Sequence, residues 1–228
     1  MEKRLKWNAI GFEQKTQILR DEIKTDQEKL PPDHLKEYRK LQLFLEELNH
    51  LLEKMQAIQT DLIPEIEAKF RVRFPTPELL MLALSRPSIR NIYTDVKTHF
   101  EKQANHPLKL EEYDELASSG EAANVLALIG DSVLGLAIIQ VLWDSSLATV
   151  GELTVKRKET VSNEHLARIC DKWKLYEFRL SRSKEPTAKD AKEETIEHEK
   201  ATLVEAIFKV IYLEFGFQDL IRILPHVQ

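Results

Sequence analysis

The chain has 228 residues, 43% hydrophobic and 31% charged, a composition typical of a globular protein with one sizeable core and an appendage. Its formal net charge of −5 excludes a protein that holds nucleic acid by overall positive charge alone. A single cysteine, Cys170, excludes an internal disulfide and is interpreted as a small core residue in a reducing cytoplasm. Scarce glycine and abundant Ala, Leu, Glu and Lys predict an all-α fold.

Residues 1–62 are predicted to form an antiparallel helical hairpin. Residues 12–29 show a weak, charged helical pattern; Pro31 and Pro32 then break the chain, and Asp33 is the expected N-cap. Residues 34–59 carry the clearest helical stripe, with apolar side chains three or four positions apart at Tyr38, Leu41, Leu45, Leu48, Leu52 and Met55. We expect Pro64 to end the hairpin. Its pattern indicates a packing or dimerisation arm.

A second helical domain is predicted over residues 63–228. Thr76 and Pro77 indicate one helix start, and the spacing of Thr149 and Glu152 is that of a capping box that opens a short basic helix. Residues 91–120 lack sustained periodicity and are expected to form a long irregular connection. The segment 183–195 is polar and expected to be mobile. Helices are predicted over residues 121–143, 162–173 and 197–215.

One carboxylate, Asp131, lies in the most apolar run of the chain, "ALIGDSVLGLAII". An ionised carboxylate there costs several kcal/mol, roughly, unless it is paired, hydrogen-bonded or bound to a metal. The small residues Gly130 and Gly135 let another helix or a ligand approach closely.

Because polar residues interrupt the run of residues 125–142, we interpret it as a buried core helix and expect no membrane partner. The N-terminus has no apolar stretch that would indicate secretion.

The best partner for Asp131 is Glu205, in the apolar stretch "TLVEAIF". Two carboxylates cannot neutralise each other, so a shared divalent cation is the natural solution, and hard oxygen ligands favour Mg²⁺ or Mn²⁺. Two alternatives stay open: an ordinary exposed pair of Glu205 with Lys209 four residues later, and an Asp131 that caps a helix or accepts from a backbone amide.

The segment from Lys156 to Lys184 is locally basic, with nine Lys or Arg residues against four Asp or Glu residues. The run Lys156, Arg157 and Lys158 opens this segment. It indicates either a solvated helix face or a surface that binds phosphates.

Three stretches in this order, "NVLALIGDSVLGLAI", "GELTVKRKETVSNEHLARI" and "ATLVEAIFKVIYLEFG", together with the upstream "LLMLALSRPS", resemble the catalytic domain of the ribonuclease III family over residues 65–225. The resemblance implies that Asp131 and Glu205 are the catalytic, metal-binding acids, with Mg²⁺ as cofactor and Mn²⁺ as a substitute. It also implies an endoribonuclease that cleaves double-stranded or structured RNA through an activated water, with the 3′-oxygen leaving, and a homodimer. Lys156, Arg157 and Lys158 would then contact RNA.

The sequence departs from the family at three acids, where it has Asn124, Ala127 and Thr202. The last two are similar to the compact Mini-III branch, which lacks a separate domain for double-stranded RNA. The same departures motivate an alternative function, a catalytically degenerate ribonuclease III fold that binds RNA or protein.

Overall fold

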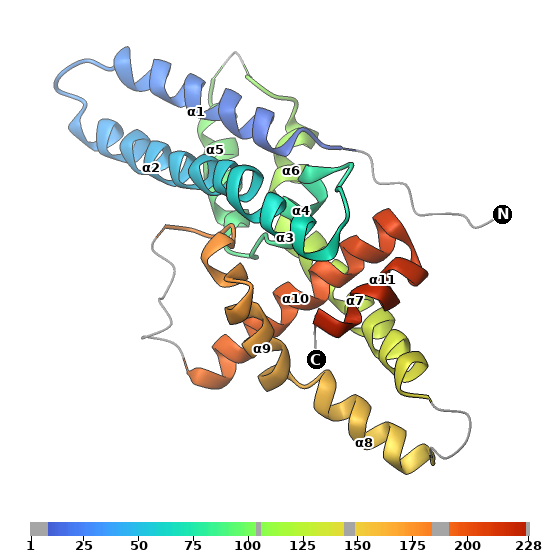
Figure 1. Ribbon diagram of the computed structural model, residues 1–228. Helices are drawn as coiled ribbons and strands as arrows, with labels where there is room; N and C mark the ends of the chain where they lie inside the picture. The colour runs from blue at the N-terminus through green and yellow to red at the C-terminus, as the bar shows by residue number, and fades with distance from the viewer. Residues whose placement is uncertain (1–8, 104–105, 144–148, 184–191, 227–228) are drawn as a thin grey trace.

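The computed structural model describes residues 9–103, 106–143, 149–183 and 192–226, and in these residues the fold is all-α, as predicted, with no β-strand. One isolated bridge pairs Ser85 with Leu180. Figure 1 shows the arrangement of the α-helices, which are α1 (Phe12–Glu28), α2 (Leu35–Ala57), α3 (Ile63–Phe70), α4 (Pro77–Ala83), α5 (Ile89–Phe100), α6 (Leu110–Ala117), α7 (Ser119–Leu142), α8 (Val150–Thr160), α9 (Asn163–Lys172), α10 (Glu193–Phe215) and α11 (Phe217–Ile223). Short 3₁₀ turns follow at η2 (Leu175–Phe178) and η3 (Leu224–His226).

The predicted N-terminal hairpin is present as α1 and α2, which lie side by side in antiparallel directions (Figure 1). The apolar stripe of α2 is buried at Leu41, Leu45, Leu48 and Met55. The N-cap of α2 is His34 and not Asp33, one residue later than expected. The hairpin therefore forms from the helical periodicity that the sequence displays.

Pro64 does not end the hairpin, which corrects the sequence prediction. A π-helical turn, η1 (Ile58–Leu62), joins α2 directly to α3, and the amide of Ile63 donates to the carbonyl of Ile58, five residues back. Pro64 lies in the first turn of α3, where its missing N–H is tolerated because the hydrogen-bond pattern changes at that point. The chain thus crosses the predicted boundary between residues 62 and 63 as continuous helix, and that domain division stays a prediction.

The expected irregular connection over residues 91–120 is wrong, because α5 and α6 occupy most of it. The buried residues of α5 recur at helical spacing and pack beside the hairpin. Polar contacts join the same elements: Thr16 and Tyr93 share a hydrogen bond of 2.8 Å, and the Asp26 carboxylate lies 3.1 Å from His99 Nε2. The hairpin and this segment therefore form one packed unit.

The most extensive packing between two helices is that of α10 along α7. The buried residues of both helices belong to the same hydrophobic core. Among the described residues α7 is also the one helix long and apolar enough to cross a membrane by length and composition, a test that core helices of soluble proteins pass as well. The pair α7 and α10 carries the two carboxylates singled out by the sequence.

Candidate functional site

Asp131 and Glu205 lie next to each other where α7 and α10 cross. Gly130 is buried, and a Cβ atom at this position would overlap the backbone carbonyl oxygen of Glu205. The absence of a side chain therefore lets the backbone of α10 rest directly on α7. This close approach fixes the relative positions of the two carboxylates, whose residues are 74 positions apart in sequence.

The two carboxylates are partly buried and lack a compensating charge. Burial, and then the negative charge of Asp131, raise the pKa of the Glu205 carboxyl to about 7. Within the described part of the chain neither carboxylate has a hydrogen bond or an ion pair, so Asp131 does not cap a helix or accept from a backbone amide there. Such a pair gains free energy from a bound cation.

Lys209 does not form the exposed ion pair with Glu205 that was the open alternative. Its side chain is only 2% exposed, and burial lowers the pKa of its ammonium group. The ammonium lies 4.7 Å from the centre of the Tyr212 ring, where a cation–π interaction stabilises it. The spacing of four residues gave the wrong pairing because helix spacing does not reveal which face is buried.

Two carboxylates are all that the site offers. No group of three or more His, Cys, Asp or Glu residues able to hold a metal ion occurs among the described residues. At the positions of the missing family acids, Ala127 is buried, Thr202 donates to the carbonyl of His198 at 2.8 Å, and Asn124 Nδ2 lies 3.5 Å from Glu121. A cation bound here would take the rest of its ligands from water or a phosphate-bearing ligand.

The basic run lies on α8, which extends from the body of the molecule (Figure 1). Lys156 and Lys158 are exposed and Arg157 is partly buried. The predicted capping box is confirmed, with Glu152 N donating to Thr149 Oγ1 at 3.2 Å and Thr149 N to Glu152 at 2.9 Å. α8 has no fully buried residue, so it presents its cations to solvent.

Gly135 lies under the guanidinium group of Arg157, since a Cβ there would come within 2.6 Å of Arg157 Nη2. Gly130 and Gly135 thus have intramolecular partners, the backbone of α10 and the side chain of Arg157. The expectation that Gly130 and Gly135 let another helix approach closely is therefore confirmed, by α10 at Gly130 and by the Arg157 side chain of α8 at Gly135.

The sequence did not predict the exposed apolar side chains of α7, four of which, Val125, Leu128, Leu136 and Ile139, form a group. Their spacing of three, eight and three residues places them along one side of the helix. Leu128, with 70% of its surface exposed, is the most prominent. These apolar residues are visible in the sequence, but apolar residues occur on every side of α7. The sequence therefore does not distinguish the exposed face of the helix from its buried face.

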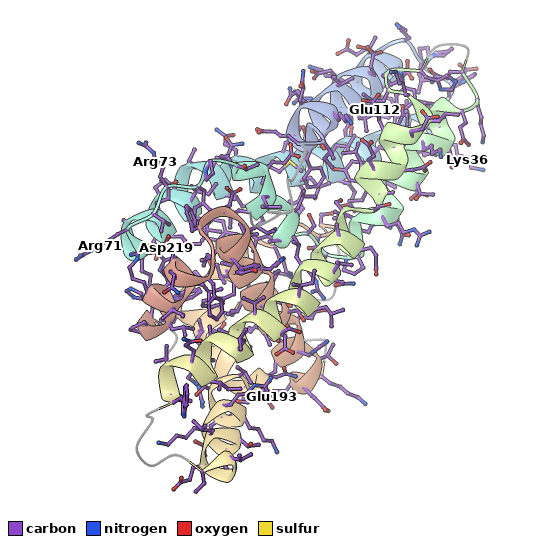
Figure 2. The ribbon with its side chains drawn as sticks, turned by 90° about the vertical axis from the view of Figure 1, so that its right-hand side faces the viewer. Lys36, Arg71, Arg73, Glu112, Glu193 and Asp219 are labelled. Carbon is purple, nitrogen blue, oxygen red and sulfur yellow. The ribbon has the colours of Figure 1, made fainter. Side chains whose placement is uncertain are left out.

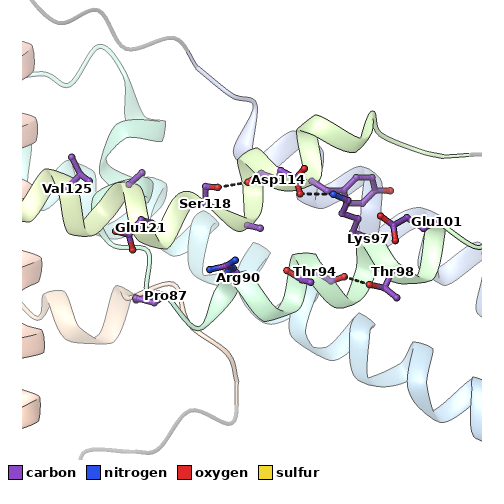
Figure 3. Close-up of a pocket in the computed structure, with 13 residues that line it drawn as sticks. Pro87, Arg90, Thr94, Lys97, Thr98, Glu101, Asp114, Ser118, Glu121 and Val125 are labelled. Carbon is purple, nitrogen blue, oxygen red and sulfur yellow. Dashed lines mark hydrogen bonds and ion pairs between the residues drawn. The ribbon is translucent and has the colours of Figure 1, made fainter.

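A groove of about 870 Å³ lies between α5, α6 and the start of α7 (Figure 3), also missed by sequence reasoning. Its walls carry both charges, and Lys97 and Asp114 form an ion pair of 2.7 Å across it. Neither Asp131 nor Glu205 lines this groove. The groove and the carboxylate pair are therefore separate features.

Comparison with known proteins identifies one domain. The Ribonuclease III domain family matches residues 124–216, which run from α7 into the end of α10 and include Asp131, α8 and Glu205. The chain is 35% identical to Ribonuclease 3 of Sinorhizobium medicae over 108 residues, 45% of this chain and 43% of that protein. It is 30% identical to Ribonuclease 3 of Clostridium acetobutylicum over 158 residues, 68% of this chain and 56% of that protein.

The chain thus spans about half the length of the curated relatives it matches. No solved structure shows a significant match. The helices α1–α6 precede the residues matched by the family.

Proposed function

We propose that this chain, whose residues 124–216 match the Ribonuclease III domain family, is an endoribonuclease that cleaves double-stranded or structured RNA. The observation that carries the proposal is the uncompensated carboxylate pair at the crossing of α7 and α10. Asp131 and Glu205 would be its catalytic, metal-binding residues. The proposal does not assign the chain to the Mini-III branch, which no comparison supports.

The carboxylate pair fits a divalent cation. Both groups offer hard oxygen donors, and burial together with the negative charge of Asp131 raises the pKa of Glu205. We therefore propose Mg²⁺, with Mn²⁺ as a substitute, held by Asp131 and Glu205. When bound, such an ion polarises a phosphodiester and lowers the pKa of a water molecule.

The residues of the chain would bind and orient the RNA around this site. Lys156, Arg157 and Lys158 on α8 would contact backbone phosphates, which attract cations regardless of base sequence. An A-form duplex would be selected by its shape and its 2′-hydroxyl groups.

We further propose a homodimer formed through the exposed apolar side of α7. Four apolar side chains at Val125, Leu128, Leu136 and Ile139 expose between 38% and 70% of their surface. A two-fold axis through this side would bury the same residues from both chains, as a closed dimer requires. The two carboxylate pairs would then lie on either side of the axis, each facing one RNA strand.

The alternative, a catalytically degenerate fold that binds RNA or protein, rests on Asn124, Ala127 and Thr202. None of these side chains can supply a carboxylate ligand, so the site has two acids where the family pattern has more. A site with two acids binds a cation more weakly. The alternative predicts RNA binding without cleavage.

The experiment that separates the two is incubation of a long RNA duplex with the pure protein in Mg²⁺, in Mn²⁺ and in a chelator. The proposal expects metal-dependent cleavage, and expects Asp131→Asn and Glu205→Gln each to reduce it by about a hundredfold or more. Glu28→Gln on the exposed side of α1 is the matched control. Binding of the duplex without cleavage in either metal would support the degenerate fold.

A further inference from the structure

A second group of cations lies away from α8, where the end of α3, the end of α9, and α11 with η3 after it meet. Its members are Lys69, Arg71, Lys172, Arg222 and His226, called here the cationic cluster. In Figure 2, Arg71, Arg73 and Asp219 lie at one edge of the molecule, while Lys36 lies at the opposite end. Only Lys172 falls inside the residues matched by the family.

An aromatic platform holds these cations in place. Phe70 contacts both Trp173 and His226, with ring centres 5.2 Å and 5.5 Å apart. The Lys69 ammonium lies 5.2 Å from the centre of the Trp173 ring, and Arg222 Nη1 donates to the carbonyl oxygen of Phe70 at 2.9 Å. Arg71 follows Phe70 directly and Lys172 precedes Trp173, so the same two aromatic residues position both side chains.

The cluster is short of negative charge. Asp219 pairs with Arg222 at 3.0 Å, and no ion pair forms with Lys69, Arg71 or Lys172 within the described residues. Burial and then the charge of Lys172 lower the pKa of Lys69, against the opposing effect of Glu65. Burial lowers the pKa of His226 too, and so do four neighbouring cations, Lys69, Lys172, Arg222 and Arg71. Like charges held this close favour a bound anion.

We propose that the cationic cluster binds the phosphate backbone of RNA, as a contact surface additional to that of α8. Arg71, Lys172 and Arg222 are exposed and come from three separate segments, an arrangement that suits an extended polyanion. Lys172 also ends the α9 helix that follows α8, so the cluster continues the basic stretch of the chain. The choice of RNA among polyanions rests on the proposed function.

The test measures binding of an RNA duplex of about two helical turns in the presence of a chelator, so that cleavage does not enter. The test variant carries Lys69→Gln, Arg71→Gln and Lys172→Gln. The matched control carries Lys24→Gln, Lys29→Gln and Lys36→Gln, three exposed lysines near the tip of the hairpin. Both remove the same charge. If the test variant does not fold by circular dichroism, the exposed pair Arg71→Gln and Lys172→Gln replaces it.

We expect the test variant to bind the duplex at least about tenfold more weakly at 0.1 M salt, and its log–log salt slope to fall by about 2 to 3, since each phosphate contact contributes about 0.9. The control should stay within about twofold of the parent. Equal losses in both variants, or a parent that does not bind the duplex, would overturn the proposal. Stronger competition by polyglutamate than by RNA would overturn it in favour of an acidic protein.

This outcome is separate from that of the proposed function. Binding that depends on the cluster, in a protein that cleaves no RNA, would support the cluster while rejecting the endoribonuclease. Cleavage of RNA by a protein whose binding does not depend on the cluster would support the endoribonuclease and reject the proposed role of the cluster.

Discussion

The crossing of α7 and α10 and the projecting helix α8 hold functional side chains in opposite ways. At the crossing, backbone rests on backbone at Gly130, and the two carboxylates are partly buried. On α8 no residue is fully buried, and the helix is held by its capping box and by Arg157 lying over Gly135. A cation requires its ligands at fixed positions, whereas phosphates attract cations over several ångströms. Rigidity is therefore found where the proposed chemistry needs it.

The largest expected effect is that of Gly130→Ala, which tests the rigidity of the crossing. The new Cβ would meet the backbone of Glu205, which cannot move aside as a side chain can. We expect a loss of about 3 kcal/mol or more in the free energy of unfolding, measured by urea denaturation. Gly135→Ala is the control, because there the new Cβ meets the movable end of Arg157. Equal losses in the two variants would contradict the comparison.

The carboxylate pair should make stability depend on pH in the metal-free protein. The pKa of Glu205 is raised from 4.5 to about 7, so between these values the folded protein binds more protons than the unfolded chain. The free energy of unfolding should therefore fall as pH rises from about 4.5 to 7, by at most about 3 kcal/mol.

Glu205→Gln should remove this fall and leave a flatter curve, whereas Glu28→Gln should not. The measurement is urea denaturation at several pH values in a chelator. If unfolding free energy depended on pH in the same way in the parent and in Glu205→Gln, the negative charge of the pair would be compensated in the parent.

The cations of α8 should influence RNA binding and leave stability almost unchanged. Replacing Lys156, Arg157 and Lys158 by Ala should lower the log–log salt slope of duplex binding by up to about 2.7, since each contact contributes about 0.9. The change in unfolding free energy should stay below about 1 kcal/mol, because α8 buries no residue completely. An unchanged salt slope would identify α8 as a solvated face.

The smallest expected effect is that of Thr149→Ala, which removes the N-cap of α8. The lost hydrogen bonds to Glu152 should cost about 1 kcal/mol locally. We expect faster hydrogen exchange at the amides of the first turn of α8, with an unchanged melting temperature. Faster exchange throughout the molecule, or a large drop in melting temperature, would mean that α8 is coupled to the core.

The sequence predicted those helices whose apolar residues have a single clear period. It placed α2 and α9 within about two residues of their observed ends because one face of each is buried. It failed for α5 and α6, where Pro107 and the stretch Ser118-Ser119-Gly120 suggested a loop. Gly120 in fact lies within α7, where a Cβ would come within 2.5 Å of the Arg86 carbonyl oxygen. Gly120 therefore serves close packing against Arg86 and does not form a turn.

For the site, the sequence singled out Asp131 and Glu205 because carboxylates are rare in apolar helices, and the structure places them side by side. It could not predict the burial of Lys209 or the contact of Arg157 with Gly135, which depend on how the helices cross. The cationic cluster was also out of reach, since its residues come from three distant segments. Sequence spacing reports neighbours on one helix, and these features arise between helices.

The π-helical turn at Ile58–Leu62 sets the rotational phase between two helices. Each residue of an α-helix turns the chain by about 100°, so a single residue added or removed here would rotate all of α3 by that angle about its axis. The buried side chains Ile66 and Phe70 would then leave the core, and the platform beneath the cationic cluster would be lost. The length of this five-residue segment is therefore a strict geometric constraint. Insertions and deletions should be tolerated in the loop between α1 and α2 and rejected here.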